Sequence, residues 1–427
     1  MKKKLAIYGG PKTINKKFRP YNSLGEEERI AVDKVMRSGI LSQFLGTWHK
    51  DFYGGPKVRE FEKMSADYFG VKHAITVNSW TSGLIAAVGA LDIEPGDEII
   101  VSPWTMSASA TAILHWNAIP IFADIEEDTF NIDPISVEAN ITEHTKAIMA
   151  VDIFGHSADM NALRKIADKH NLKIISDTAQ APGATYRGEY AGTLADIGGF
   201  SLNYHKHIHT GEGGIIVTND SILAERVELI RNHAEVVVEG KGVENLNNMI
   251  GYNFRLGEIE SAIGIEQLKK LKGYTDSRKR MANRLSEGLS NLQGLKTPVV
   301  KEDCSHVYYV YPLVLDIEML DCSKFKIAEA LRGEGLEVST AYQNIHLLPM
   351  YQKKIAFGSA GFPWTADFAR QNISYAKGIC PVAEGLNDET YIGFGMCVYD
   401  LNDDDIDLII MAFQKVWDNL DQLRDSA

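Results

Sequence analysis

The stretch IGGFSLNYHKHIHTGEGGIIVTN, residues 197–219, carries the pattern on which the predicted fold depends. Its two ends, IGGFSL and GGIIVTN, have the length and apolar character of short buried strands. Similar apolar runs recur from residue 74 onward, and helical stretches separate them. This alternation predicts an α/β domain with a mainly parallel central sheet. Because such sheets bind ligands at the carboxyl ends of their strands, the polar middle of the stretch lies where a site is expected.

The chain divides into three parts by the character of its sequence. Residues 1–70 contain an arm and helices, and residues 71–293 contain the α/β pattern, which ends in a long helical stretch. Residues 294–427 contain the strand VYYVYPLVL and end in the helix DDDIDLIIMAFQKVWDNL. We therefore expect a large α/β domain followed by a smaller α+β domain at the C-terminal end.

The composition narrows the classes of partner. Of the 427 residues, 45% are hydrophobic and 24% are charged, and the net charge is −13. An acidic chain is not expected to bind nucleic acid or an anionic membrane surface. No apolar run reaches the roughly 18 residues that a membrane-spanning helix requires. The four cysteines are scattered without a CxxC pair, which favours a reducing cytoplasm and argues against a structural zinc site.

Three histidines alternate with other residues in HKHIH, residues 205–209. On a strand, His205, His207 and His209 would share one face, where they could ligate zinc. The alternative makes Lys206 the reactive group and the histidines its surroundings. A lysine near the carboxyl end of a strand, beside glycines that allow tight turns, can anchor pyridoxal phosphate as a Schiff base. We favour the lysine and expect no metal ion.

Two further motifs contain groups that this cofactor requires. SDTAQAPGA ends a strand at Asp177, a carboxylate that could pair with the pyridine nitrogen. NSWTSGL places Thr81 and Ser82 at the start of a helix, where backbone N–H groups bind phosphate. Ser201 could add a further hydroxyl. Each feature alone has a simpler explanation, because aspartate is common in turns and because Ser and Thr commonly cap helices.

In this order, NSWTSGL, SDTAQAPGA, FSLNYHKHIHTGEGG and GYNFRLGEIESAIGIEQLKKL resemble the DegT/DnrJ/StrS group of sugar aminotransferases. The resemblance covers nearly the whole chain and includes FPW and CPVAEGL near its end. It implies the fold type I of pyridoxal-phosphate-dependent transferases, as in aspartate aminotransferase. It also implies pyridoxal 5′-phosphate as the cofactor. The most specific part of the pattern is a serine, four residues, a lysine and then GEGG.

The resemblance implies a role for each matching residue. Lys206 would carry the cofactor and move protons between cofactor and substrate. Asp177 would pair with the ring nitrogen, and Gln180 would contact the ring's 3-hydroxyl. The implied phosphate binders on the same chain are Thr81, Ser82 and Ser201.

Other matches concern the partner subunit and the substrate. Asn253 matches a residue that completes the phosphate site of the neighbouring subunit, which implies a homodimer with shared active sites. Arg255 is the next candidate for that contact. His346, in NIHLLPMY, resembles a substrate-side histidine, although an ordinary loop histidine would look the same. We expect His205 on the substrate side as well.

Three places depart from the family pattern. Trp80 stands where a small residue is usual, so its side chain must point away from the phosphate or reshape the phosphate site. Met106, in TMSAS, stands where an aromatic ring usually stacks on the cofactor, and a thioether can still lie against a π face. YIGFGMCVYDL, residues 391–401, differs from the usual substrate-contact stretch.

The resemblance implies transfer of an amino group from glutamate or glutamine to a nucleotide-linked ketosugar or to a keto-cyclitol. It also implies a role in amino-sugar and polysaccharide biosynthesis. One alternative is a sugar dehydratase, which carries histidine in place of the lysine. A slip of one residue in the match would put His205 or His207 there. A second alternative is a non-enzymatic regulator that senses the cofactor or a sugar. The set of Lys206, Asp177 and Gln180 favours the enzyme.

Overall fold

The computed structural model describes residues 4–424, and its centre is a seven-stranded sheet in the order β1-β9-β8-β5-β4-β2-β3. Neighbouring strands run parallel except at β9, which pairs antiparallel with β1 and β8. The strands are β1 (His73–Val77), β2 (Glu98–Val101), β3 (Ile119–Phe122), β4 (Thr145–Val151), β5 (Lys173–Asp177), β8 (Ile197–Ser201) and β9 (Gly214–Thr218). Nearly all their residues are buried, as in sheets covered on both faces. The predicted α/β class is therefore confirmed.

Helices pack against both faces of this sheet. On one face, Phe200 and Ile215 join a core with residues of α2 and α9, and on the other, Ile75 joins the larger core that includes α3 and α4. The short strands β6 (Thr185–Tyr186) and β7 (Glu189–Tyr190) form a separate antiparallel ribbon. In the sequence, this ribbon lies between β5 and β8. The helices of this part are α1 (Glu26–Ser38), α2 (Pro56–Phe69), α3 (Trp80–Ala90), α4 (Ala108–His115), α5 (Pro134–Ala139), α6 (Met160–His170), α7 (Ser221–Arg231), α8 (Ala234–Lys241) and α9 (Glu258–Leu289).

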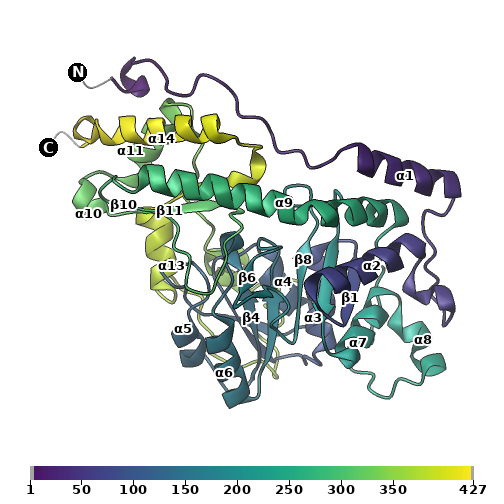
Figure 1. Cartoon of the computed structure of the whole chain (residues 1–427). Coiled ribbons are helices and arrows are strands. Elements are labelled where there is room, and N and C mark those ends of the chain that lie inside the picture. Colours follow the sequence, from purple (N-terminus) through teal and green to yellow (C-terminus); the bar gives the residue numbers. More distant parts are fainter. Residues whose placement is uncertain (1–3, 425–427) are drawn as a thin grey trace.

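The long helix α9 connects the two ends of the molecule. Figure 1 shows it running from the neighbourhood of α1 and α2 to that of β10 and α10. It packs against α1 and α2 near its start and against α14 (Asp403–Trp417) farther along. Side chains such as Leu268 and Leu285 are buried in different cores, so one continuous helix ties both parts of the fold together.

The smaller part is built on an antiparallel sheet of β10 (Leu295–Lys296), β11 (Tyr311–Leu315) and β12 (Tyr391–Phe394). Its core joins residues of β11, α11 (Lys324–Gly333) and α14. The short helix α10 (Ile317–Leu320) follows β11. Leu5 and Ile14 of the N-terminal arm are buried in the same core. The first residues of the chain thus complete the part formed by the last ones.

One segment differs from the expected division of the chain. Residues 345–386 fall within the expected small domain, but their buried side chains, such as Tyr351 and Tyr375, join the core of the large sheet. Both rings pack against Phe122 at the end of β3. The segment contains α12 (Pro349–Lys353) and α13 (Pro381–Gly385). It therefore forms a long excursion of the chain onto the large part between β11 and β12.

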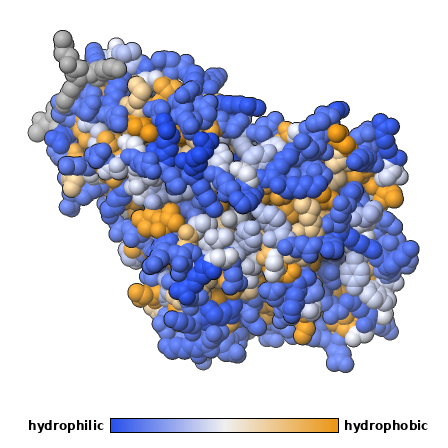
Figure 2. All heavy atoms as spheres, in the orientation of Figure 1, coloured by the Kyte–Doolittle hydropathy of each residue, from blue (hydrophilic) through white to orange (hydrophobic). Residues whose placement is uncertain are grey.

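Polar side chains dominate the face of the molecule drawn in Figure 2, and apolar side chains appear there as separate spots. This agrees with an ordinary globular composition. None of the helices within residues 4–424 is both long enough and apolar enough to cross a bilayer.

Candidate active site

The segment around Lys206 forms a turn instead of continuing strand β8. Residues 204–205 are turn and 206–208 bend, and the Lys206 N–H donates to the Asn203 carbonyl at 2.9 Å. The chain closes on itself where the Thr210 N–H donates to the Leu202 carbonyl at 3.0 Å. The alternating-face arrangement of the histidines, which requires a strand, is therefore not formed.

The three histidines have different surroundings. His207 is fully buried, with Nε2 2.9 Å from the Val307 carbonyl oxygen. Burial lowers its pKa well below the usual value. His209 Nδ1 lies 3.3 Å from the backbone nitrogen of Gly211. No group of three or more potential metal-ligating side chains occurs in the part of the chain that the structure describes.

Lys206 itself is enclosed, with 7% of its surface exposed. Burial lowers its pKa to about 8, against the opposing effect of the Asp177 carboxylate. Its Nζ atom lies 4.4 Å from the centre of the Tyr309 ring. A lysine with a lowered pKa holds more of the neutral amine near physiological pH, and the neutral amine is the nucleophilic form.

His205 is half-buried next to the lysine. Its ring centre lies 6.0 Å from that of Tyr309, so both rings border the same lysine. Burial and the charge on Lys206 lower the pKa of His205 to about 4. The imidazole is therefore neutral at physiological pH and can donate one hydrogen bond and accept another. A role for His205 on the substrate side stays a prediction.

Asp177 is the last residue of β5 and is buried. Two side chains donate to its carboxylate. The Trp80 indole N–H reaches Oδ1 at 2.7 Å, and the Ser109 hydroxyl reaches Oδ2 at 2.7 Å. The backbone N–H of Ala179 adds a longer bond of 3.3 Å to Oδ1. Donors on both oxygens fix the plane of the carboxylate.

The Gln180 amide is held at both ends. Its Oε1 accepts the Phe154 backbone N–H at 2.9 Å, and its Nε2 donates to the Tyr342 hydroxyl at 3.1 Å. Phe154 follows β4 and has a positive φ of 58°, which turns the backbone toward the glutamine. Tyr342 comes from the C-terminal third of the chain, so Gln180 joins two distant segments near the carboxyl ends of β4 and β5.

The start of α3 supplies hydroxyl groups. Ser79 caps the helix by accepting the Ser82 N–H at 3.0 Å, and the two hydroxyls lie 2.9 Å apart. Thr81 is exposed in the first turn. Ser201, the last residue of β8, pairs with Gly214, whose backbone lies against the start of α3. The structure thus brings Ser201 close to the predicted Thr81 and Ser82, at a helix start suited to an anion.

The side chains of Met106 and Asn253 are both exposed to solvent. Met106 is 66% exposed, on the loop between β2 and α4. The Asn253 carbonyl accepts from the Asn78 side chain at 3.2 Å, and Asn253 Oδ1 accepts from Arg255 at 2.7 Å. Asn253 therefore lies beside the start of its own chain's α3, and its side chain is exposed. Contact of either residue with a cofactor stays a prediction.

His346 does not fit its predicted role on the substrate side. The residue is fully buried, and its Nε2 lies 2.9 Å from a Glu384 carboxylate oxygen. Its ring also packs near Phe122 at the end of β3. Because no part of the ring is exposed, it serves the packing of the 345–386 segment and presents no group to a substrate in this structure.

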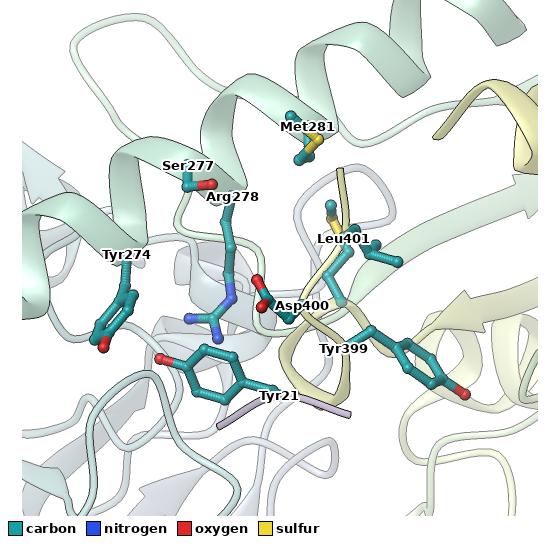
Figure 3. A pocket seen from close by; sticks show the side chains of 9 residues that line it. Tyr21, Tyr274, Ser277, Arg278, Met281, Tyr399, Asp400 and Leu401 are labelled. Atoms are coloured by element: carbon teal, nitrogen blue, oxygen red, sulfur yellow. The ribbon is translucent and has the colours of Figure 1, made fainter. Parts of the chain in front are cut away.

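A hollow on the surface adjoins the Lys206 turn from the side of the N-terminal arm. Figure 3 shows Arg278 reaching from α9 toward the Tyr21 ring, between Tyr274 and Asp400. The guanidinium lies 4.4 Å from the centre of the Tyr21 ring. The Tyr21 hydroxyl donates to the His207 carbonyl at 2.6 Å. The arm and α9 therefore brace the turn that carries the lysine.

The sequence does not indicate four contributors to this site: Ser109, Tyr309, Tyr342 and Trp80 as a hydrogen-bond donor. Ser109 was part of the segment matched to the stacking position, but nothing in the sequence connects it to Asp177. Tyr309 and Tyr342 come from the C-terminal third, where no local motif marks them. Trp80 stands out in the sequence as a large residue where a small one is usual, but its hydrogen bond to Asp177 has no signal in the sequence.

Comparison with known proteins gives a consistent result. The profile of the DegT/DnrJ/EryC1/StrS aminotransferase family matches residues 24–391. A GDP-perosamine synthase from Caulobacter vibrioides is 36% identical over 390 residues, covering 90% of this chain and 96% of that protein. An L-glutamine:scyllo-inosose aminotransferase from Streptomyces griseus is 31% identical over 428 residues, covering 98% and 99%.

The fold comparison agrees with the sequence comparison. An aminotransferase from Psychrobacter cryohalolentis has a similar crystal structure, with a TM-score of 0.80 and 28% identity. The match covers 95% of this chain and all of that one. The turn with a buried lysine, the paired aspartate and the hydroxyls at the start of α3 lie in the matched region. The chain belongs to the DegT/DnrJ/EryC1/StrS aminotransferase family.

Proposed function

We propose that this protein transfers an amino group from glutamate or glutamine to a ketone carbon of a sugar or cyclitol, with Lys206 as its catalytic residue. The enzyme is a transaminase of the sugar aminotransferase type, and its cofactor is pyridoxal 5′-phosphate. One observation carries the residue assignment. A buried lysine with a lowered pKa lies within electrostatic reach of a buried aspartate, and each carboxylate oxygen of that aspartate accepts a hydrogen bond.

The groups present suit the chemistry of this cofactor. Asp177 offers a buried carboxylate for a protonated ring nitrogen, and Gln180 offers an oriented amide for the ring's hydroxyl. Thr81, Ser82 and Ser201 offer hydroxyls for the phosphate. When bound, the cofactor supplies an electron-accepting ring that stabilises negative charge on a substrate carbon.

Lys206 has two tasks in this proposal. Its neutral amine holds the cofactor when no substrate amine is bound, and once displaced it takes a proton from one carbon and returns it to another. A pKa of about 8 suits both directions of that transfer, because the amine and the ammonium are both accessible near physiological pH. The Tyr309 ring covers the amine and limits its exposure to water.

The position of Lys206 supports transamination over dehydration. A dehydratase of this family would have histidine at the lysine position. The pairing of Ser201 with Gly214 fixes the ends of the turn, and the buried residue between them next to Asp177's charge is the lysine. His207 is already bonded to the Val307 carbonyl, and His205 is only half-buried.

The acceptor and donor classes follow from the relatives. One matched protein is named for GDP-perosamine and another for glutamine and scyllo-inosose, so we propose a nucleotide-linked ketosugar or a keto-cyclitol as acceptor. Cys304, Cys380 and Cys397 are free thiols among the described residues, which supports a cytoplasmic setting. The exposed Asn253 beside the start of α3 supports a homodimer in which each subunit completes the other's phosphate site.

A substrate panel tests the proposal. The purified enzyme would be offered ketosugar nucleotides and keto-cyclitols, each with glutamate and with glutamine, and the products would be weighed by mass spectrometry. We expect an amino product from one acceptor class and the matching keto acid from the donor. Loss of water from the sugar without gain of nitrogen would contradict the proposal and support the dehydratase.

A further inference from the structure

Trp80 occupies a slot that is shaped for it by glycines. The residue is 5% exposed, at the first position of α3. A Cβ on Gly83 would come within 2.7 Å of its ring, and one on Gly214 within 2.9 Å of its backbone. A Cβ on Gly199 of β8 would overlap the ring. The indole therefore lies flat against α3, β8 and β9, in space that only glycines leave free.

The slot aims the indole N–H at one acceptor. Trp80 Nε1 lies 2.7 Å from Oδ1 of Asp177, across the sheet edge from α3 to the end of β5. The indole N–H is a donor only, so it stabilises the ionised carboxylate and cannot accept a proton from the acid. Ser109 donates to the other oxygen at 2.7 Å. Together they hold the Asp177 carboxylate in one plane.

We propose that Trp80 is a positioning residue for cofactor binding, which holds the Asp177 carboxylate oriented toward the ring nitrogen of the cofactor. This inference rests on the assignment of Asp177 to that nitrogen under the proposed function. A carboxylate that turns out of this orientation would meet the ring nitrogen less well. The bulky residue beside the phosphate-binding hydroxyls thus serves the opposite end of the cofactor from the end that those hydroxyls bind.

A second buried tryptophan provides a matched control. Trp116, after α4, is 6% exposed, and its indole N–H donates at 2.8 Å to the Ile85 backbone carbonyl. It also packs against a glycine, Gly89, where a Cβ would overlap its ring. Trp116→Phe removes the same kind of donor from the same kind of slot but leaves Asp177 untouched.

The experiment measures the affinity of the apo form of each variant for pyridoxal 5′-phosphate at neutral pH. In Trp80→Phe, the carboxylate loses a charge-assisted donor and is no longer held in one plane, so it should bind the ring nitrogen of the cofactor less tightly. The dissociation constant at neutral pH should rise by about tenfold. Trp116→Phe should leave the dissociation constant unchanged, although its thermal stability should fall about as far as that of Trp80→Phe.

The outcomes separate this inference from the proposed function. If the wild-type protein does not bind the cofactor, the proposed function fails. If it binds and Trp80→Phe keeps the wild-type affinity, or if Trp116→Phe lowers the affinity equally, the role of Trp80 is rejected. Should Trp80→Phe fail to fold, Gly83→Ala is the second variant, because the atoms nearest to a Cβ there are those of the Trp80 ring and the substitution keeps the indole N–H. An unchanged dissociation constant in Gly83→Ala would reject the role as well.

Discussion

At the scale of single residues, the proposed chemistry depends on two buried groups, Asp177 and Lys206. Asp177 receives donors on both oxygens and lies within reach of Lys206. Lys206 is enclosed by the protein, so its ammonium form is disfavoured. Burial of each group lowers the stability of the fold, and each group is proposed to act in catalysis. Removing one charge at a time tests these effects.

Replacing Asp177 by asparagine keeps the size of the side chain and removes its charge. The ring nitrogen of the cofactor then loses its ionic partner, and breaking a buried pair costs about 3–5 kcal/mol. We expect the kcat of Asp177→Asn to fall by at least about a hundredfold, while the circular dichroism spectrum stays that of the wild type. Transamination at the wild-type rate would contradict the role of Asp177.

Lys206→Met tests the cost of the buried ammonium in the apo protein. The folded pKa of about 8 lies below the ordinary lysine pKa of 10.5, so between those two pH values the unfolded chain binds more protons. The stability of the wild type relative to Lys206→Met should therefore rise as pH increases from about 8 to about 10.5. Over this window, the stability difference should change by about 3 kcal/mol in favour of the wild type as the pH rises.

Denaturant titrations at several pH values check this prediction. Lys269→Met is a suitable control, because Lys269 is largely exposed and pairs with Glu266 on the same helix. The change in relative stability over the same pH window should be larger for Lys206→Met than for Lys269→Met. A difference between wild type and Lys206→Met that stays constant with pH would contradict the lowered pKa.

At the scale of elements, the strand ends predicted most of the site. Asp177 and Ser201 end β5 and β8, which pair in parallel, so the sheet alone brings them to one edge. The turn at 204–208 was not predicted, because alternation in HKHIH resembles a strand while the bonds that close the turn lie at Asn203 and Thr210. His346 was misplaced for a related reason, since its burial depends on contacts with distant residues such as Glu384.

Tyr21 connects the N-terminal arm to the lysine turn, and its removal should loosen both. Tyr21→Phe loses the 2.6 Å hydrogen bond to the His207 carbonyl, which is worth about 1 kcal/mol. We expect a lower free energy of unfolding and faster hydrogen exchange at residues 203–210. Tyr8→Phe is the control, because the Tyr8 hydroxyl also donates to a backbone carbonyl, that of Gln422, but at an exposed position. Equal exchange of residues 203–210 in both variants would contradict the bracing role.

At the scale of the whole molecule, the chain is one body tied together by α9 and by the 345–386 segment. That segment could not be assigned to the large part from sequence. The spacing of its apolar residues does not indicate which core they join. The proposed dimer belongs to this scale as well. If Asn253 serves the neighbouring site, a mixed dimer of Lys206→Ala and Asn253→Ala subunits carries one site with both lesions and one with neither.

Co-expression of the two variants with different affinity tags tests the shared site. Purified mixed dimers should recover up to about half of the wild-type activity, while each parent alone is impaired. Arg255→Ala replaces Asn253→Ala if the latter alone is mild. Mixed dimers no more active than their parents, or a fully active monomer, would contradict the shared site.

The central claim is that the amine of Lys206 carries the cofactor, and borohydride reduction tests it most directly. The holoenzyme would be reduced with borohydride, digested, and mapped by mass spectrometry for peptides that carry the phosphopyridoxyl group. The account predicts one labelled site, at Lys206, and loss of that label together with the visible absorption band in Lys206→Ala. A label on any other lysine of the wild type, or an unchanged label in Lys206→Ala, would contradict it.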